Sequence, residues 1–386
     1  MISPSNRSNA IKEYYFSLKL QEIELLNRNG FDVINLGIGN PDLPPPDAVI
    51  GELSKSIADS TAHGYQSYKG INELRESFSL WYKRYFSVDL NPDKEILPLM
   101  GSKEGIMHIS MAFVNPGESI LIPNPGYPTY KAVAKIVGAK VIEYNLSETT
   151  NWFVDFDELE KLALDKVKLM WVNYPNMPTG QNATKKQFKK LIDFAVKHSI
   201  LIVNDNPYSF ILNSKPLSIL AVPEAHKVAL ELNSLSKSHN MAGFRIGMLA
   251  GNSSYLKSVL KIKSNMDSGM YKPLQLAATC ALNQDNSWYQ SNNSAYLKRR
   301  VLVEQLIDLV KGEYSKQQSG LFIWSKIPSS FTSSVAFSDY YLDKAKVFFT
   351  PGIVFGSNGE GYFRVSLCST IETLKKAILR IQQIQR

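Results

Sequence analysis

Between residues 102 and 280, short apolar runs alternate with amphipathic segments, and this alternation constrains the fold more than any other feature of the chain. Helices are predicted after Ser102, from Tyr130, over residues 155–164 and after Thr184. Strands are predicted over residues 119–122, 140–144, 168–173, 201–204, 228–232 and 246–250. Strands that alternate with helices predict an α/β domain whose open, mostly parallel sheet lies between helices. Ligands of such sheets bind beyond the carboxyl ends of the strands.

The segments on either side of this region follow a different pattern. Residues 9–29 predict a helix and residues 32–36 a strand, and the proline-rich residues 41–46 mark a stiff boundary. Beyond residue 284, a long helix is predicted over residues 296–310, and short strands are predicted over residues 321–324, 334–337 and 362–365. We therefore expect an N-terminal arm with part of a small domain (1–44), a large domain (45–283) and a small α+β domain (284–386).

Composition narrows the classes of function. The 43 Lys and Arg exceed the 35 Asp and Glu, giving a net charge of +8 without a basic block. This balance suits anionic small molecules, or simply a solvated basic surface, better than a nucleic-acid stripe. The two cysteines and five scattered histidines predict neither a disulfide framework nor a metal site. Because no stretch has the character of a signal peptide or membrane span, we expect a cytoplasmic protein.

Chemically distinctive residues follow three consecutive predicted strands. Asn173 begins a polar turn after one strand, Asp205 and Tyr208 follow the next, and Ser234-x-Ser236-Lys237 follows a third. All three turns should face one crevice. A lysine with a lowered pKa can form a Schiff base, and an aspartate can keep a pyridinium nitrogen protonated, so that the ring accepts electrons. The pattern therefore predicts a site for an electrophilic ring cofactor.

The chain resembles the fold-type-I aminotransferases of class I/II, which use pyridoxal 5′-phosphate and include aspartate, aromatic and diaminopimelate aminotransferases. The most specific elements are Ser234-x-Ser236-Lys237 and Gly243-x-Arg245-x-Gly247, both after Asp205-x-x-Tyr208. The resemblance covers nearly the whole chain. It implies an enzyme that moves an amino group between an α-amino acid and a 2-oxo acid in a ping-pong reaction.

The resemblance also implies roles for individual residues. Lys237 forms the Schiff base and moves the proton, Asp205 pairs with the ring nitrogen, and Tyr208 contacts the phenolic oxygen; these are the predicted catalytic residues. Tyr127 stacks on the ring, and Asn176 is a further predicted contact of the cofactor. The predicted phosphate ligands are Gly101, Ser102, Lys103, Ser234 and Arg245. The turn at Gly101 suits an anion because it opens a helix, whose first N–H groups are free.

Two further implications concern the partner subunit and the substrate. Tyr65 matches a tyrosine that reaches the phosphate of the neighbouring subunit, which implies a homodimer with shared sites. Arg364 and Gly39 match the groups that bind the substrate α-carboxylate, the arginine through its planar fork. The resemblance breaks at Met177, where the family has an asparagine that donates to the phenolic oxygen of the cofactor.

Other functions remain open at this point. A β-lyase acting on cysteine conjugates would share every residue named above, and a diaminopimelate-specific aminotransferase is a narrower alternative. A non-catalytic protein that has kept the cofactor fold is disfavoured because Lys237, Asp205 and Arg364 are all present. A dinucleotide enzyme is disfavoured because prolines follow Gly37-x-Gly39 where a phosphate-binding helix would have to begin.

Overall fold

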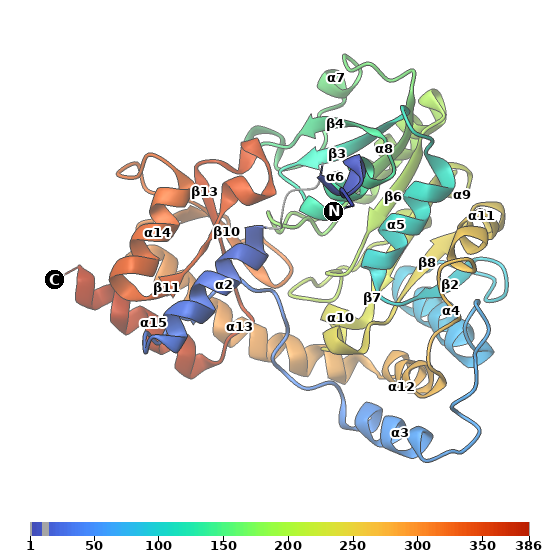
Figure 1. Ribbon diagram of the computed structural model, residues 1–386, viewed down its shortest axis with the longest axis horizontal. Helices are drawn as coiled ribbons and strands as arrows, with labels where there is room; N and C mark the ends of the chain where they lie inside the picture. The colour runs from blue at the N-terminus through green and yellow to red at the C-terminus, as the bar shows by residue number, and fades with distance from the viewer. Residues whose placement is uncertain (1, 10–14, 386) are drawn as a thin grey trace.

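The structure is a computed structural model and describes residues 2–9 and 15–385 of the 386-residue chain. Figure 1 shows two parts, a larger one around a seven-stranded sheet and a smaller one around a four-stranded sheet. This is the mostly parallel α/β fold, with a smaller α+β part, that the sequence predicts. None of the helices in these described ranges is both long and apolar enough to cross a membrane.

The large sheet has the strand order β2-β8-β7-β6-β5-β3-β4. All neighbours are parallel except that β8 runs antiparallel to both β2 and β7. Its strands are β2 (Ile96–Leu99), β3 (Ser119–Asn124), β4 (Lys140–Asn145), β5 (Val167–Val172), β6 (Leu201–Asp205), β7 (Ala229–Ser234) and β8 (Gly247–Gly251). Every residue of β3, β6 and β7 is buried, because helices cover both faces of the sheet.

Alternate residues of these strands enter different cores. Leu169 and Trp171 of β5 pack on the face covered by α5, α6 and α11, whereas Met170 and Val172 pack on the opposite face against α8. On that opposite face, α4 and α12 cover β2 and β8. The helices of this larger part are α3 (Asp47–Ile57), α4 (Asn72–Phe86), α5 (Ser102–Phe113), α6 (Pro128–Ile136), α7 (Phe156–Leu159), α8 (Lys185–His198), α9 (Ala225–Val228), α10 (Leu235–Ser238), α11 (Ser253–Lys263) and α12 (Lys272–Leu282).

The smaller part contains an antiparallel sheet with the order β12-β13-β10-β9 and a parallel pair, β1 with β11. The strands are β1 (Ile34–Asn35), β9 (Glu313–Tyr314), β10 (Phe322–Lys326), β11 (Val347–Phe348), β12 (Thr350–Pro351) and β13 (Tyr362–Ser366). The remaining helices are α1 (Asn6–Asn9), α2 (Tyr15–Arg28), α13 (Asn286–Leu309), α14 (Ser334–Ala345) and α15 (Ile371–Ile384). Pairing of β1 with β11 brings the N-terminal segment into this part of the molecule.

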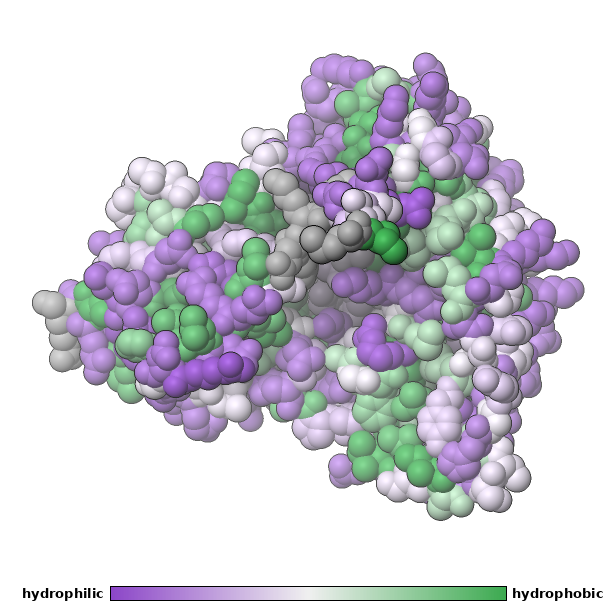
Figure 2. Space-filling model, viewed as in Figure 1, coloured by the Kyte–Doolittle hydropathy of each residue, from purple (hydrophilic) through white to green (hydrophobic). Residues whose placement is uncertain are grey.

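Helix α13 joins the two parts. Tyr289 near its start belongs to the core under α4 and α12, whereas Val303 and Ile307 belong to the core of the small part. The expected boundary near residue 284 thus falls just before a helix that packs on both sides. The face turned to the viewer in Figure 2 is hollowed between the two parts.

Several predicted elements differ from the structure. The helix predicted over residues 296–310 is the longer α13, which begins at Asn286, and the strand predicted over residues 32–36 is only the two-residue β1. Residues 334–337, predicted as a strand, begin helix α14, because the Ser333 side chain accepts the N–H of Ala336 and the buried Phe337 and Tyr341 lie one turn apart. The helix expected over residues 155–164 is only the short α7, capped by Asp155. The helix predicted over residues 9–29 is observed as α2, and residues 10–14 of that range lie outside the described residues.

Candidate active site

The carboxyl ends of the parallel strands line a cavity of about 410 Å³ between the two parts of the molecule. Asp205 is the last residue of β6, Ser234 is the last of β7, and Asn173 follows β5 directly. The small part closes the cavity with Phe322, Phe355 and Arg364. Four cationic side chains (Lys103, Lys237, Arg245 and Arg364) and one anionic side chain (Asp205) line it within the described chain. This excess of positive charge suits an anionic ligand.

Asp205 is held at the base of the cavity from two sides. Its Oδ2 accepts a hydrogen bond from the hydroxyl of Tyr130 at 2.8 Å, and its backbone carbonyl accepts one from Asn173 Nδ2 at 2.5 Å. Its Oδ1 is buried and has no hydrogen-bond partner within the described part of the chain. Burial raises the pKa of Asp205 to about 6, although the hydrogen bond from Tyr130 lowers it. The carboxyl group is thus fixed with one oxygen available to a ligand.

Tyr130 and Asn173 are absent from the predicted site residues. Tyr130 lies in α6, is 1% exposed, and stacks on Trp171 at 5.1 Å between ring centroids, with an interplanar angle of 4°. Asn173 also accepts the N–H of Met177 at 2.7 Å, so it links β6 to the turn after β5. In the sequence, Tyr130 is indistinguishable from a core tyrosine, whereas Asn173 stands out as the start of a polar turn that should face the crevice, although no role is predicted for its side chain.

Lys237 lies in the short helix α10, which starts directly after β7. The Ser234 side chain accepts the N–H of Ser236 at 3.1 Å and so caps this helix. The Lys237 amine donates a hydrogen bond to the Gly39 carbonyl at 2.5 Å, across 198 positions of sequence. Burial lowers the pKa of Lys237, and the positive charges of Arg364 and Arg245 lower it further. A lysine in this environment is easier to deprotonate, as a nucleophilic amine must be.

The start of α5 approaches Arg245 closely. Gly101 has a φ of +83°, and a Cβ at this position would overlap the Arg245 guanidinium. A Cβ on Gly247 would lie 2.8 Å from the Ser102 nitrogen, so the β8 backbone is packed against the same turn. The Arg245 guanidinium thus lies against the start of α5, and Ser102, Ser234 and Arg245 all line the cavity. This combination of N–H groups and positive charge binds phosphate in many proteins.

Arg364 is buried in β13 and is held by backbone, sulfur and aromatic rings. Its Nη2 donates to the Gly37 carbonyl at 2.8 Å, and its Nη1 donates to Met177 Sδ at 3.1 Å. The guanidinium carbon lies 3.7 Å from the ring centroid of Phe322 and 4.6 Å from that of Phe355. Gly39 is needed beside it, because a Cβ there would overlap the Phe322 ring.

Unlike most of the predicted cofactor contacts, Asn176 does not line the cavity. Asn176 is buried, and its side chain accepts from Thr179 at 2.8 Å and donates to the Asn173 carbonyl at 3.2 Å. These bonds lie within its own turn, and Asn176 does not line the cavity. Met177 does line it and contacts Arg364, so the position where the resemblance breaks lies beside the predicted carboxylate-binding arginine.

The tyrosines predicted from the resemblance fall into two groups. Tyr127 and Tyr208 both line the cavity, and burial raises the pKa of Tyr208 while Arg364 opposes that rise. Tyr65 is 94% exposed and does not line it. Its position on the surface is the one a residue needs if it is to reach another subunit.

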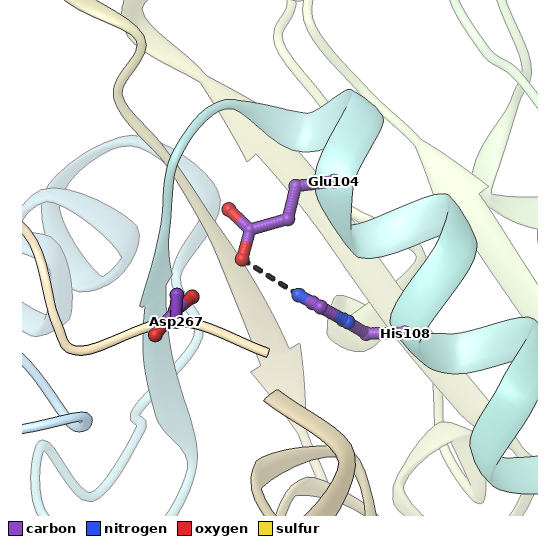
Figure 3. Close-up of side chains that lie close together, drawn as sticks. All are labelled: Glu104, His108 and Asp267. Carbon is purple, nitrogen blue, oxygen red and sulfur yellow. Dashed lines mark hydrogen bonds and ion pairs between the residues drawn. The ribbon is translucent and has the colours of Figure 1, made fainter. Parts of the chain in front are cut away.

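Figure 3 shows a second polar cluster, close to the start of α5. Glu104 Oε1 lies 2.7 Å from His108 Nε2, and ligating atoms of Glu104, His108 and Asp267 all lie within 4.8 Å of one another. The buried Lys263 ammonium donates to both Asp267 carboxylate oxygens, at 2.7 and 2.6 Å. Because Lys263 already supplies the positive charge, we assign no metal to this cluster. In the sequence, this cluster could have been anticipated only from Glu104 and His108, which lie four residues apart on one helix.

Known proteins share this fold over its whole length. Residues 32–381 match the model of the family "Aminotransferase class I and II". The LL-diaminopimelate aminotransferase of Dehalococcoides mccartyi is 38% identical over 98% of this chain and 97% of its own, and that of Aquifex aeolicus is 38% identical over 100% of both. The structure of apo-BacF from Bacillus subtilis superimposes with a TM-score of 0.95 at 34% identity, covering 100% of this chain and 99% of that one.

The fold and these matches define an aminotransferase with the fold of the type I pyridoxal-phosphate enzymes. The chain belongs to the class I and II aminotransferase family, whose members depend on pyridoxal phosphate. It is an enzyme that moves an amino group between an α-amino acid and a 2-oxo acid. The resemblance seen in the sequence is thereby confirmed.

Proposed function

We propose that this chain binds pyridoxal 5′-phosphate in the 410 Å³ cavity and uses it to exchange amino groups between an α-amino acid and a 2-oxo acid. The observation that carries the proposal is the buried, unpartnered Oδ1 of Asp205, in the same cavity as Lys237. An unsatisfied buried carboxylate oxygen is costly, and a protonated ring nitrogen would satisfy it.

The donor set fits the cofactor. Asp205 would hold the ring nitrogen, Tyr208 the phenolic oxygen, and Tyr127 a face of the ring. The first turn of α5, from Gly101 to Lys103, would hold the phosphate together with Ser234 and Arg245. When bound, pyridoxal phosphate supplies an electron-withdrawing ring that accepts the electron pair of the substrate Cα–H bond.

Lys237 and Arg364 would act on different groups of the substrate. The Lys237 amine, whose pKa is lowered by burial, can take up a proton at Nζ and return it within the cavity. The Gly39 carbonyl holds that amine at 2.5 Å and so orients it. Arg364 would bind the α-carboxylate through its planar fork, and the phenyl rings of Phe322 and Phe355 exclude water around that ion pair.

The test is to load the purified protein with pyridoxal phosphate, remove the excess and record visible absorbance, then reduce with borohydride and map the labelled peptide. We expect the label on Lys237. Amino donors with 2-oxo acids should give amino transfer. Release of pyruvate and ammonia from cystathionine without amino transfer would instead support a β-lyase. Because relatives are named LL-diaminopimelate aminotransferases, that compound is the first narrow candidate donor to test.

We also propose that the enzyme is a cytoplasmic homodimer. Tyr65 is 94% exposed, and the loop around Gly269 packs on the Gln66 and Ser67 carbonyls, beside the exposed Met266. A second copy would cover these groups, and Tyr65 would reach its phosphate site. Both cysteines are free, as suits a reducing compartment. Cell fractionation tests the location.

Hybrid dimers test the shared site. Protomers carrying Tyr65→Phe and Lys237→Ala should each be weakened or inactive alone, yet a hybrid would contain one site with both native residues. Activity should therefore return when the two are refolded together. Proven hybrids without activity would contradict the shared site.

A further inference from the structure

The segment between β1 and α3 passes from the small part of the molecule to the large part. This crossing segment, residues 37–46, leaves the small part at Gly37 and passes α13 on its way to α3 (Figure 1). Its Gly39 carbonyl accepts the hydrogen bond from the Lys237 amine at 2.5 Å. Whatever fixes the crossing segment therefore also fixes the acceptor of that amine.

A buried ion pair holds the crossing segment against α13. Arg299 of α13 is 5% exposed and binds Asp42 in two places, with Nη1 donating to Oδ1 at 2.6 Å and Nη2 to Oδ2 at 2.8 Å. Its Nη1 also donates to the Leu367 carbonyl at 3.1 Å, directly beyond β13. Because a bidentate pair of this kind fixes direction as well as distance, it sets the position of Asp42 relative to both α13 and β13.

The backbone between this ion pair and Gly39 is stiff. Only two residues, Asn40 and Pro41, separate Asp42 from Gly39. The proline ring fixes its own φ and restricts the backbone of the residue before it. Gly39 packs so closely on the Phe322 ring that a Cβ would lie 2.1 Å from Cζ. A displacement of Asp42 should therefore move the Gly39 carbonyl as well.

The contact between the crossing segment and Arg364 has anchors of its own. The Gly37 carbonyl accepts from Arg364 Nη2 at 2.8 Å and from the Thr350 hydroxyl at 3.3 Å. The preceding Leu36 makes backbone hydrogen bonds to both β11 and β13. Loss of the ion pair should therefore disturb Lys237 more than Arg364.

We propose that Asp42 and Arg299 are positioning residues for Lys237: their ion pair holds the Gly39 carbonyl where it orients the amine for proton transfer. The inference rests on the proposed function. There, Nζ takes the proton from the substrate Cα while the electron pair of that bond passes to the cofactor ring, and it then delivers the proton to the cofactor carbon that carries the amino group. A misplacement of about 1 Å can slow such a step about 10²-fold. Neither positioning residue is among the described residues that line the cavity, so both would act through Gly39.

Half-reactions of the loaded enzyme test the effect on proton transfer. The probe is the fastest donor among LL-diaminopimelate, L-glutamate, L-phenylalanine and L-alanine, unlabelled and α-deuterated. Asp42→Ala should lower the maximal rate about 10- to 10²-fold, while the dissociation constant of the donor stays within about threefold. The isotope effect should exceed that of the parent protein, because proton transfer then limits the rate more completely. Asp42→Asn keeps the size of the side chain and one neutral acceptor, so it should give a smaller loss in the same direction even if Asp42→Ala folds poorly.

A second readout needs no cofactor. Acetylation of Lys237 by acetic anhydride in the cofactor-free protein is followed by peptide mass spectrometry, with Lys189 of α8, 44% exposed, as the internal reference. A carbonyl acceptor stabilises the protonated amine, which does not react. Asp42→Ala should therefore raise the ratio of Lys237 to Lys189 acetylation about threefold or more. An unchanged ratio would show that the ion pair does not hold the amine, and would overturn the inference.

Glu304→Gln is the matched control. Glu304 also lies in α13, accepts a hydrogen bond from Arg300 Nε at 2.8 Å, and has a side chain that is 21% exposed, against 29% for Asp42. The control should leave the rate, the isotope effect and the acetylation ratio within about twofold of the parent values. If Asp42→Ala weakens donor binding and leaves the maximal rate unchanged, the ion pair serves Arg364 instead and the inference is wrong.

Failure of the proposed function has a different signature. If the parent protein does not retain the cofactor or transfers no amino group, the proposed function fails, whereas the acetylation ratio still tests whether the ion pair holds the amine. If the parent transfers amino groups and Asp42→Ala matches it in rate and isotope effect, the proposed function stands and only the positioning role is wrong.

Discussion

The two halves of the cavity are built in different ways. The half proposed to hold the cofactor comes from turns that directly follow strands of one sheet, and its key residues Asp205, Ser234 and Lys237 fall within 33 positions of sequence. The half proposed to hold the substrate is assembled from Gly39, Met177, Phe322, Phe355 and Arg364, which span most of the chain. The charged groups proposed to hold the cofactor ring are close together in the sequence, whereas the surroundings of Arg364 depend on how distant segments meet.

The largest expected effect comes from a substitution in the half of the cavity that is proposed to hold the cofactor. Lys237→Ala removes the group proposed to hold the cofactor and to move the proton, so multiple-turnover amino transfer should fall by about 10⁴-fold or more. The visible absorbance of the loaded protein should also disappear. Absorbance spectra and steady-state assays measure both.

Lys189→Ala, on the outside of α8 and 44% exposed, is the matched control and should behave as the parent protein. If Lys237→Ala keeps the absorbance and borohydride traps the cofactor on another lysine, the assignment of Lys237 is wrong.

The next largest effect separates cofactor binding from catalysis in the same half of the cavity. Asp205→Ala should still retain cofactor through the α5 turn and Arg245, but the ring nitrogen would lose its charged partner. The rate of the half-reaction with the best donor should fall by about 10²- to 10³-fold. Stopped-flow absorbance measures it, and a fall of less than tenfold would refute the proposed role.

These two residues show what the sequence could reveal. The alternation of strands and helices predicted the sheet, and polar residues at or just after a strand end stand out against apolar neighbours, so Asp205 and Lys237 could be predicted as site residues, and both line the cavity. Tyr130 was missed because a buried tyrosine in an amphipathic helix has no local mark of its hydrogen bond to Asp205. Phe322 and Phe355 were missed because their role comes from contact with Arg364, 42 and 9 positions away. Residues 334–337 failed as a strand because four residues do not distinguish a strand from the first turn of a helix.

A third prediction concerns the pH dependence of stability without cofactor. The pKa of Asp205 is raised from 3.8 to about 6 by burial, so the folded protein binds this proton more tightly than the unfolded chain does. Its stabilising contribution is complete below pH 3.8 and is lost as the pH rises through about 6. Asp205→Asn lacks this dependence. Relative to the variant, the parent should therefore lose about 2 to 3 kcal/mol of unfolding free energy between pH 4 and pH 7.5.

Urea unfolding at a series of pH values measures this difference. Glu231, whose pKa is also raised by burial, is present in both proteins, and its charge contributes to the raised pKa of Asp205, so the difference reports the two coupled groups together. A difference that stays constant with pH would show that Asp205 is already ionised in the folded protein.

The smallest expected effect decides to which half of the cavity Met177 belongs. The family resemblance places this position beside the phenolic oxygen of the cofactor, but in the structure Met177 Sδ accepts a hydrogen bond from Arg364 at 3.1 Å. Met177→Leu keeps an apolar side chain of similar size and removes only the sulfur acceptor. Because sulfur is a weak acceptor, KM for the amino donor should rise about two- to fivefold while kcat stays within about twofold. The pH titration of the visible absorbance should not move, since the cofactor half is untouched. Met177→Asn adds a donor that could serve either half: a titration shifted to lower pH with unchanged KM would assign the position to the cofactor, whereas a change in KM alone would keep it with the substrate.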